Sequence, residues 1–184
     1  MSQYGWKYDV VKCTGCRACV VACKSENNTD PKKSPLVVRN DDVPKEVSYR
    51  WVVTKEISSE GEVPFFSQAC NHCLNPACLA SCPVGAISKD SDDGIVLIDQ
   101  DKCIGCRYCE QACPYHAPRF NENTKKMEKC TFCYQRVRNG LKPACVSTCV
   151  GRALDYQSDA TGPSGTPPDD FADTGLTNPV ITFE

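Results

Sequence analysis

The chain has 184 residues and a formal net charge of −2, and 16 of its residues are cysteine. The length suits one compact domain or two small ones, and the absence of a long basic run argues against nucleic-acid binding. A cysteine content of about 9% indicates either a disulfide scaffold or a metal protein. Apolar residues other than cysteine make up only about a third of the chain, so we expect something else to help fill the interior.

The N-terminal stretch "MSQYGWKYDVVKC" has no basic region, apolar segment or twin arginine of the kind found in export signals. No window of the sequence approaches the ~18 consecutive apolar residues of a membrane span. The longest apolar runs, such as "GIVLI" at 94–98, have the length of a strand. We therefore expect a soluble chain that does not insert directly into a membrane.

The cysteines form four motifs, each of which opens with C-x2-C and closes with C-x3-C. Motif I is Cys13, Cys16, Cys19 and Cys23; motif II is Cys70, Cys73, Cys78 and Cys82; motif III is Cys103, Cys106, Cys109 and Cys113; motif IV is Cys130, Cys133, Cys145 and Cys149. This pattern is an internal repeat with one enlarged loop, in motif IV. Pro83 and Pro114 follow motifs II and III, whereas Lys24 and Val150 follow motifs I and IV.

The segments between the motifs predict strands, turns and loops. In the cysteine-free segment 27–69, the stretches "PLVVRN", "VSYRWVVTKEI" and "VPFFSQ" predict strands that cover the motifs or meet a partner. Segment 84–102 predicts a hairpin with its turn at Asp92-Asp93-Gly94. The loop 134–144 predicts a short helix and turn, either for docking or as a plain connection. Segment 158–179 predicts an extended strap along the protein or a partner, with a free tail as the alternative, and "VITFE" predicts a final strand.

Three kinds of site could use the cysteines. Disulfides need an oxidising compartment, and C-x2-C is spaced for a ligand rather than for distant bridges. Four zinc sites are a second possibility, although structural zinc normally takes two pairs separated by a longer spacer. The run C-x2-C-x2-C-x3-C followed by Pro is instead that of bacterial ferredoxins, which favours [4Fe–4S] clusters.

In two-cluster ferredoxins the fourth cysteine of each run ligates the other cluster. This exchange of ligands predicts four sites, each with three cysteines from one motif and the last cysteine of a partner motif. Site 1 is Cys13, Cys16, Cys19 and Cys149; site 2 is Cys130, Cys133, Cys145 and Cys23; site 3 is Cys70, Cys73, Cys78 and Cys113; site 4 is Cys103, Cys106, Cys109 and Cys82. The sixteen thiolates divide evenly into four [4Fe–4S] clusters, and they are the predicted iron ligands.

Side chains beside the motifs are candidates for balancing cluster charge, because a [4Fe–4S] core with four thiolates is an anion. We expect the flanking cations to contribute as a group, although any one of them could be an ordinary surface residue: Lys12, Arg17, Lys24, Lys102, Arg107, Lys129 and Arg152. His72 and His116 also stand beside ligands. Since the cysteine count leaves no vacancy, we expect both to be neighbours of the ligands or surface residues.

No catalytic constellation is visible in the sequence. It contains no phosphate-cradling GxxxxGK[ST], no GxGxxG and no HExxH. An iron–sulfur cluster with four thiolates has no open position for a substrate. Electron transfer is therefore the expected role.

Four stretches carry a resemblance to a known family: "QYGWKYDVVKCTGCRACVVACK", "CNHCLNPACLASCPVGAI", "CIGCRYCEQACPYHAPRFN" and "KCTFCYQRVRNGLKPACVSTCVGRAL". From about residue 3 to residue 155, the chain resembles the four-cluster iron–sulfur (beta) subunits of the dimethyl sulfoxide reductase family of molybdopterin oxidoreductases. The resemblance implies a non-catalytic subunit that accompanies a molybdopterin catalytic subunit and often a membrane anchor. It also implies that sites 1 and 2 lie toward the catalytic subunit. Some relatives carry tryptophan in place of the second cysteine of motif III and hold a three-iron cluster, so Cys106 implies four complete clusters.

The sequence thus predicts an α+β fold with two bacterial-ferredoxin-like modules in a pseudo-twofold repeat, each with two [4Fe–4S] clusters. Residues 1–26 and 121–157 form the first module, 27–69 a small β insertion, 70–120 the second module and 158–184 an extended C-terminal strap. The expected function is relay of single electrons between the molybdopterin subunit and a quinone-linked anchor or soluble carrier, as in anaerobic respiration. A stand-alone polyferredoxin for a hydrogenase or formate system and a zinc-based scaffold are the alternatives. We expect assembly in the cytoplasm, followed by retention there or export with the catalytic partner.

Overall fold

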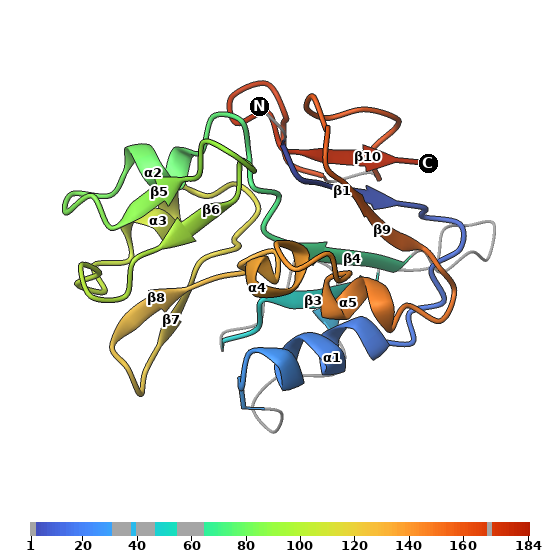
Figure 1. Ribbon diagram of the computed structural model, residues 1–184, viewed down its shortest axis with the longest axis horizontal. Coiled ribbons are helices and arrows are strands. Elements are labelled where there is room, and N and C mark those ends of the chain that lie inside the picture. Colours follow the sequence, from blue (N-terminus) through green and yellow to red (C-terminus); the bar gives the residue numbers. More distant parts are fainter. Residues whose placement is uncertain (1–2, 31–37, 40–46, 55–64, 169–170) are drawn as a thin grey trace.

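A computed structural model of the chain describes residues 3–30, 38–39, 47–54, 65–168 and 171–184 (Figure 1). Figure 1 shows two lobes, with the chain crossing between them. In one lobe, β1 (Gly5–Tyr8) is the central strand of a small sheet. It pairs antiparallel with β9 (Leu154–Gln157) and parallel with β10 (Ile181–Phe183). Strand β10 confirms the prediction for "VITFE", whereas β1 and β9 were not predicted.

The described part of segment 27–69 forms a second sheet, as predicted. β2 (Val38–Arg39) runs parallel to β3 (Arg50–Thr54), which pairs antiparallel with β4 (Phe65–Ala69). The register places Arg50 opposite Ala69. Residues 47–49, at the start of the second predicted strand, precede β3 and are not in a strand. The other residues of the three predicted strands, at 35–37, 40, 55–57 and 63–64, lie outside the described residues.

Two hairpins shape the other lobe. β5 (Ile87–Lys89) and β6 (Val96–Ile98) pair antiparallel and confirm the hairpin predicted within 84–102. β7 (Arg119–Asn121) and β8 (Lys126–Glu128) form a second hairpin that was not predicted. The Asn121 side chain accepts the N–H groups of residues 123 and 124 at 2.9 and 3.3 Å, which stabilises this turn locally.

All five helices in the described part of the chain begin within a cysteine motif. They are α1 (Ala18–Glu26), α2 (Ala77–Ala80), α3 (Tyr108–Ala112), α4 (Tyr134–Val137) and α5 (Ala144–Ser147). Helix α1 packs against α5, and α2 packs against α3, so motif I lies beside motif IV and motif II beside motif III. Helix α4 confirms the short helix predicted in the loop 134–144.

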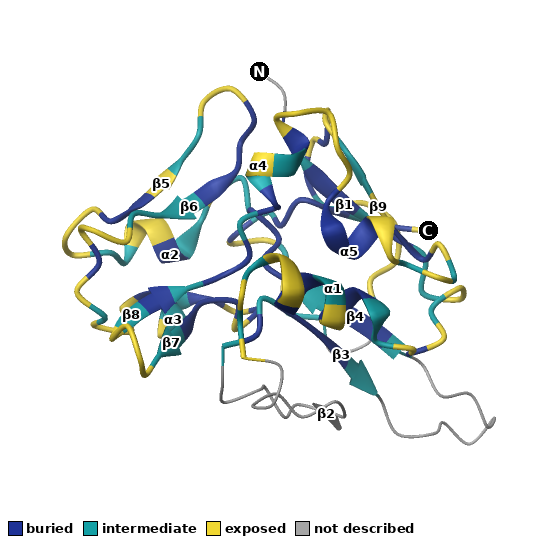
Figure 2. Ribbon diagram, turned by 60° about the horizontal axis from the view of Figure 1, so that its bottom comes forward, coloured by how far each residue is buried: buried dark blue, intermediate teal, exposed yellow. Residues whose placement is uncertain are grey.

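Buried residues occur in both lobes (Figure 2), and their side chains form a larger and a smaller cluster. The larger one includes Trp6 and Phe132, whose rings stack with centroids 4.0 Å apart. The smaller one surrounds cysteines of motifs II and III and includes Met127 of β8. The predicted module boundary between residues 120 and 121 falls inside β7. Met127, from the same hairpin, shares the smaller cluster with Cys78 of α2 and Cys109 of α3.

The described part of the C-terminal tail is an extended strap along this chain. Before entering β10, it meets the loop of motif II. The Val180 N–H donates to the Asn71 carbonyl at 3.0 Å, and the Leu74 N–H donates to the Asn178 carbonyl at 2.9 Å. Val180 and Thr177 are buried there. The strap thus joins the two lobes, because β10 pairs with β1 in one and its preceding residues contact motif II in the other.

Candidate iron–sulfur sites

All four motifs share an uncommon backbone conformation at the residue before their second cysteine. This residue is Gly15, His72, Gly105 and Phe132, with φ of 65°, 45°, 70° and 57°. Left-handed φ is uncommon outside glycine and turns the chain sharply. A side chain would also clash at these glycines: a Cβ on Gly105 would lie 2.2 Å from the Lys125 carbonyl oxygen. The repeat seen in the sequence is thus a repeat of backbone shape.

Backbone N–H groups within the motifs and beside them point at cysteine sulfur atoms. The Ala86 N–H lies 3.2 Å from Cys82 Sγ, and the Met127 N–H lies 3.3 Å from Cys103 Sγ. In motif IV the N–H of Phe132 lies 3.4 Å from Sγ of the first cysteine of the motif. Hydrogen bonds of this kind favour the thiolate over the neutral thiol.

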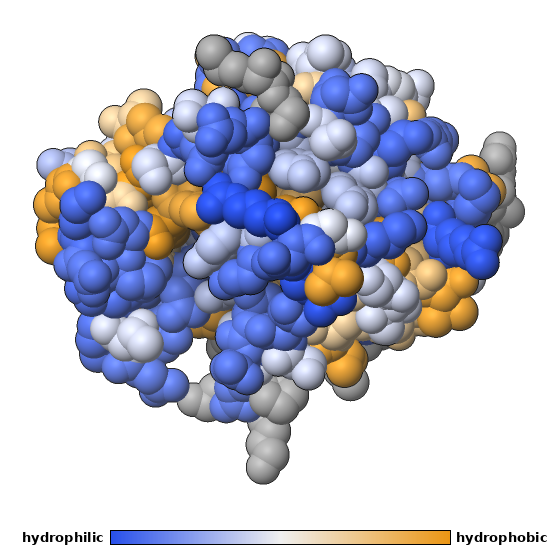
Figure 3. All heavy atoms as spheres, viewed as in Figure 1, coloured by the Kyte–Doolittle hydropathy of each residue, from blue (hydrophilic) through white to orange (hydrophobic). Residues whose placement is uncertain are grey.

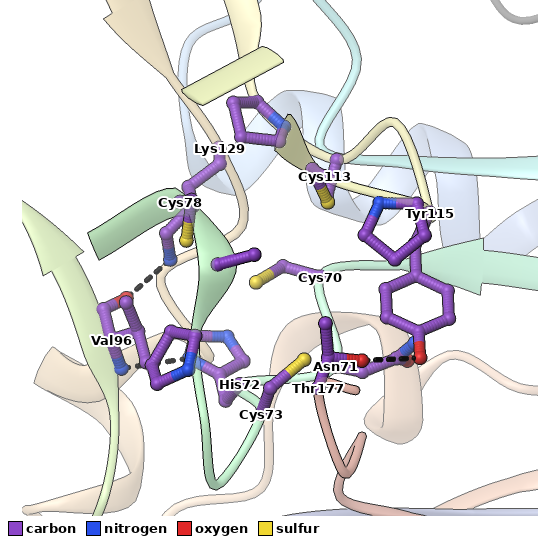
Figure 4. Close-up of a pocket in the computed structure, with 15 residues that line it drawn as sticks. Cys70, Asn71, His72, Cys73, Cys78, Val96, Cys113, Tyr115, Lys129 and Thr177 are labelled. Carbon is purple, nitrogen blue, oxygen red and sulfur yellow. Dashed lines mark hydrogen bonds between the residues drawn. The ribbon is translucent and has the colours of Figure 1, made fainter. Parts of the chain in front are cut away.

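Site 3 is a cavity bordered by cysteines from two motifs (Figure 4). Cys70, Cys73 and Cys78 of motif II face Cys113 of motif III across a space of about 370 Å³, including the part open to solvent. Burial raises the pKa of Cys113 to about 11. Four thiols in one wall, three of them buried, repel each other when ionised, so they need a compensating positive group to be thiolates together.

Two further cavities are each bordered by one of the other predicted quartets. The walls of the first contain Cys13, Cys16, Cys19 and Cys149, the quartet of site 1. The walls of the second contain Cys82, Cys103, Cys106 and Cys109, the quartet of site 4. In each case the structure brings the last cysteine of one motif to the first three of its partner motif.

The quartet of site 2 is also brought together. Burial raises the pKa of Cys23 well above its ordinary value, and Cys130 and Cys145 are the next largest causes of the rise, with Cys133 contributing less. Cys23 comes from α1, and Cys145 comes from α5, which packs against it. Residues more than a hundred positions apart in the sequence therefore share this site.

The four sites form a row. Burial is the main cause of the raised pKa of Cys19, Cys130 and Cys78, and in each case a thiol of the next site adds to the rise. The pairs in electrostatic contact are Cys19 with Cys145 (sites 1 and 2), Cys130 with Cys70 (sites 2 and 3) and Cys78 with Cys109 (sites 3 and 4). Cys16 of site 1 and Cys106 of site 4 are exposed, so the row reaches the surface at both ends.

The flanking cations divide into buried and surface residues. Lys129 is buried and borders site 3, where its Nζ donates to the Val96 carbonyl and, at 3.0 Å, to the Cys130 carbonyl. Lys24 is buried too, with its Nζ 3.1 Å from the Asp30 carbonyl. Arg17 is half-buried, and the exposed cations are Lys12, Lys102, Arg107 and Arg152.

A buried cation that the sequence reasoning missed lies between sites 1 and 2. Arg50 is 2% exposed, its Nη1 donates to the carbonyl and hydroxyl of Ser67 at 3.1 Å, and it lies 4.5 Å from the centroid of Trp6. Burial lowers the pKa of Arg50, but thiols of sites 1 and 2 outweigh burial and raise it. The sequence offered one sign of this buried cation, namely an arginine inside the predicted strand "SYRWVVT". Arg119, also buried, was missed as well.

The two histidines occupy different environments. His72 is fully buried in the wall of site 3, whereas His116 is exposed. Both expectations, a neighbour of the ligands and a surface residue, are therefore met by one histidine each.

Within the described ranges, no three His, Cys, Asp or Glu side chains converge closely enough to hold a single metal ion. Separately, no helix in the described part of the chain has the length and apolar character to cross a membrane.

Comparison with known proteins identifies domains of the 4Fe-4S type in this chain. Residues 62–159 match the family model of the 4Fe-4S dicluster domain, and residues 13–27 match that of a 4Fe-4S binding domain. The protein is 41% identical over 165 residues to one of the chains of the anaerobic dimethyl sulfoxide reductase of Escherichia coli, covering 84% of this chain and 73% of that relative.

Two other relatives have a similar level of identity. A subunit of the tetrathionate reductase of Salmonella typhimurium is 40% identical over 151 residues, covering 82% of this chain and 56% of that relative. A subunit of the sulfite dehydrogenase of Allochromatium vinosum is 40% identical over 163 residues, covering 83% of this chain and 68% of that relative. The protein therefore belongs to the family of iron–sulfur subunits found in molybdoenzymes such as dimethyl sulfoxide reductase and tetrathionate reductase, and its domains are of the 4Fe-4S type.

Proposed function

We propose that the chain is the electron-transfer subunit of a molybdopterin oxidoreductase complex and holds four [4Fe–4S] clusters in sites 1 to 4. The observation that carries this proposal is the composition of the cavities. Three cavities are each bordered by one predicted quartet of cysteines, with three from one motif and one from its partner. Four thiolates are the donor set that such a cluster takes, and when bound the clusters supply one-electron oxidation and reduction.

The wide spacing of the cysteines supports iron–sulfur clusters over zinc. In a zinc site, four ligands lie about 2.0–2.3 Å from one ion. Here the cysteines border cavities, and among the described residues no such convergence on one point occurs. The thin apolar core is consistent with the same reading, since the sites occupy part of the interior of each lobe.

The two ends of the row are the proposed contacts with partners. Val11 and Val150, next to cysteines of site 1, are 93% and 77% exposed. Ile104 and Val84 border site 4 and are 62% and 40% exposed. Figure 3 shows an apolar area at the left end of the molecule, in the lobe that contains site 4. Exposed apolar groups around a redox site are typical of a surface that another protein covers.

We assign the site 1 end to the molybdopterin subunit and the site 4 end to a quinone-linked membrane anchor or a soluble carrier. The resemblance described in the sequence analysis supplies the choice of ends, and the names of the relatives support a partner in general, because those proteins are subunits of reductases and a dehydrogenase. Assembly in the cytoplasm is proposed because cluster construction needs reduced thiols. The folded chain then stays there or is exported with its partner.

Purification of the native complex tests the proposal. We expect about 16 iron and about 16 acid-labile sulfide per chain, the content of four cubanes. After dithionite reduction the complex should give electron paramagnetic resonance signals of interacting clusters, and a large molybdenum-containing chain should co-purify. A colourless zinc protein would overturn the cofactor assignment. A brown protein that purifies alone, without molybdenum, would replace the partner assignment with a stand-alone polyferredoxin.

A further inference from the structure

We propose that His72 donates a hydrogen bond from Nε2–H to the cluster in site 3 and thereby raises the reduction potential of that cluster above its value without the bond. The inference rests on the proposed function in one respect, namely that site 3 holds a cluster. It assigns to His72 a role in tuning, not in ligation, since four cysteines already border the site.

The position of His72 is the first step. The residue is 0% exposed, and its ring forms part of the wall of the site 3 cavity beside Cys70, Cys73 and Cys78 (Figure 4). Its left-handed φ of 45° places it at the turn between the first two cysteines of motif II. The side chain is therefore held at the cavity by the same backbone turn that positions the ligands.

The protonation state of the ring follows from one hydrogen bond. The backbone N–H of Val96 donates to Nδ1 of His72 at 3.0 Å, so Nδ1 carries a lone pair and no proton. A charged imidazolium ring would need a proton on both nitrogens, which this hydrogen bond excludes. The ring is thus neutral, and its one proton must be on Nε2.

The Nε2–H donor has no protein partner among the described residues. In Figure 4 the Nδ1 side of the ring faces Val96, while the opposite nitrogen faces the sulfur atoms of the cavity. A buried donor without a partner is costly, and native proteins rarely retain one. The acceptors available in this direction are the ligand sulfur atoms and the sulfide of a bound cluster.

The effect on potential has a definite sign. Reduction adds one negative charge to the cluster, and a hydrogen-bond donor stabilises the more negative state more strongly. Hydrogen bonds to the sulfur atoms are among the factors that set cluster potentials. Removal of the Nε2–H donor should therefore make the midpoint potential of one cluster more negative.

The variant His72→Asn isolates this donor. Asparagine tolerates left-handed φ, and its short amide can still accept from the Val96 N–H, but it cannot reach the cavity with a donor at the Nε2 position. His116→Asn is the matched control, because His116 also stands beside a motif with a positive φ, of 51°, but is exposed. These are the two histidines of the chain.

We expect His72→Asn complex to retain about 16 iron per chain, with one of its four midpoint potentials shifted negative. The expected change is at least tenfold in the reduction equilibrium, equivalent to 59 mV for one electron. The His116→Asn complex should keep all four potentials. Four unchanged potentials in a fully loaded His72→Asn complex would overturn the inference.

A second measurement works even if the asparagine variant fails to load iron. In His116→Asn complex labelled with 15N-histidine, His72 is the only labelled residue of this chain. Pulsed electron paramagnetic resonance should then detect a 15N coupling to one reduced cluster, and absence of the coupling would refute the hydrogen bond. Failure of the proposed function is distinguishable, since wild-type complex would then lack iron or sulfide altogether.

Discussion

Replacement of Cys113 by serine tests the exchange of ligands between motifs II and III. Cys113 lies in motif III, yet it borders the site 3 cavity with the first three cysteines of motif II and is absent from the wall of site 4. Cys113 is also buried, at 9% exposure, so water cannot take the place of the lost thiolate unless the surrounding chain rearranges. We expect the variant to lose the cluster of site 3. Because each site takes one of four equal clusters, iron should fall by a quarter, from about 16 to about 12 per chain.

Two reference variants identify which cluster is lost. Cys73→Ser removes a ligand of site 3, and Cys106→Ser removes a ligand of site 4. In a redox titration followed by electron paramagnetic resonance, the signal missing from Cys113→Ser should coincide with the one missing from Cys73→Ser. Coincidence with Cys106→Ser instead would refute cross-ligation, because the cysteine would then serve its own motif. The reciprocal variant Cys82→Ser should match Cys106→Ser.

Three further outcomes follow from named contacts. Arg50→Met should shift the midpoint potentials of the two clusters beside it to more negative values by roughly 60 mV or more, the one-electron equivalent of about 1.4 kcal/mol. Arg50→Lys retains the positive charge, so its two midpoint potentials should stay close to the wild-type values. Gly105→Ala should lower the free energy of unfolding by about 2 kcal/mol or more in thermal denaturation, while Gly140→Ala, with a similar φ of 74° but open space around its Cβ, should cost about 1 kcal/mol. Thr177→Val should cost about 1 kcal/mol by removing the 2.7 Å hydroxyl contact with Tyr115, and an unchanged melting temperature would show that this contact does not hold the strap.

The elements that the sequence predicted well are those with a local cause. The hairpin of β5 and β6 follows from alternating strand residues around an Asp-Asp-Gly turn, and the Asp90 carboxylate accepts the Asp92 N–H there at 2.8 Å. The hairpin of β7 and β8 was missed, although Asn121 forms a comparable turn, because "RFNENTKKME" has too few apolar residues to mark strands. Its apolar anchor is a single buried methionine, Met127.

Charge placement could not be read along the chain. Arg107 and Lys129 both flank motifs, yet the first is an exposed partner of Glu110 and the second is buried at site 3. Arg50 flanks no motif and nevertheless lies between two sites. Arg50 is brought to the cysteines by the packing of β3 against α1, which is a contact between separate segments of the chain.

The sequence by itself determined the number of thiols, their grouping into four repeats and the kind of cofactor, because ligand spacing is a short-range property of the chain. Only the tertiary structure decided which cations are buried beside the sites, the order of the sites in a row and the side chains that complete each wall. These features depend on the docking of α1 on α5 and α2 on α3 and on the path of the strap, all of which arise from packing between distant segments.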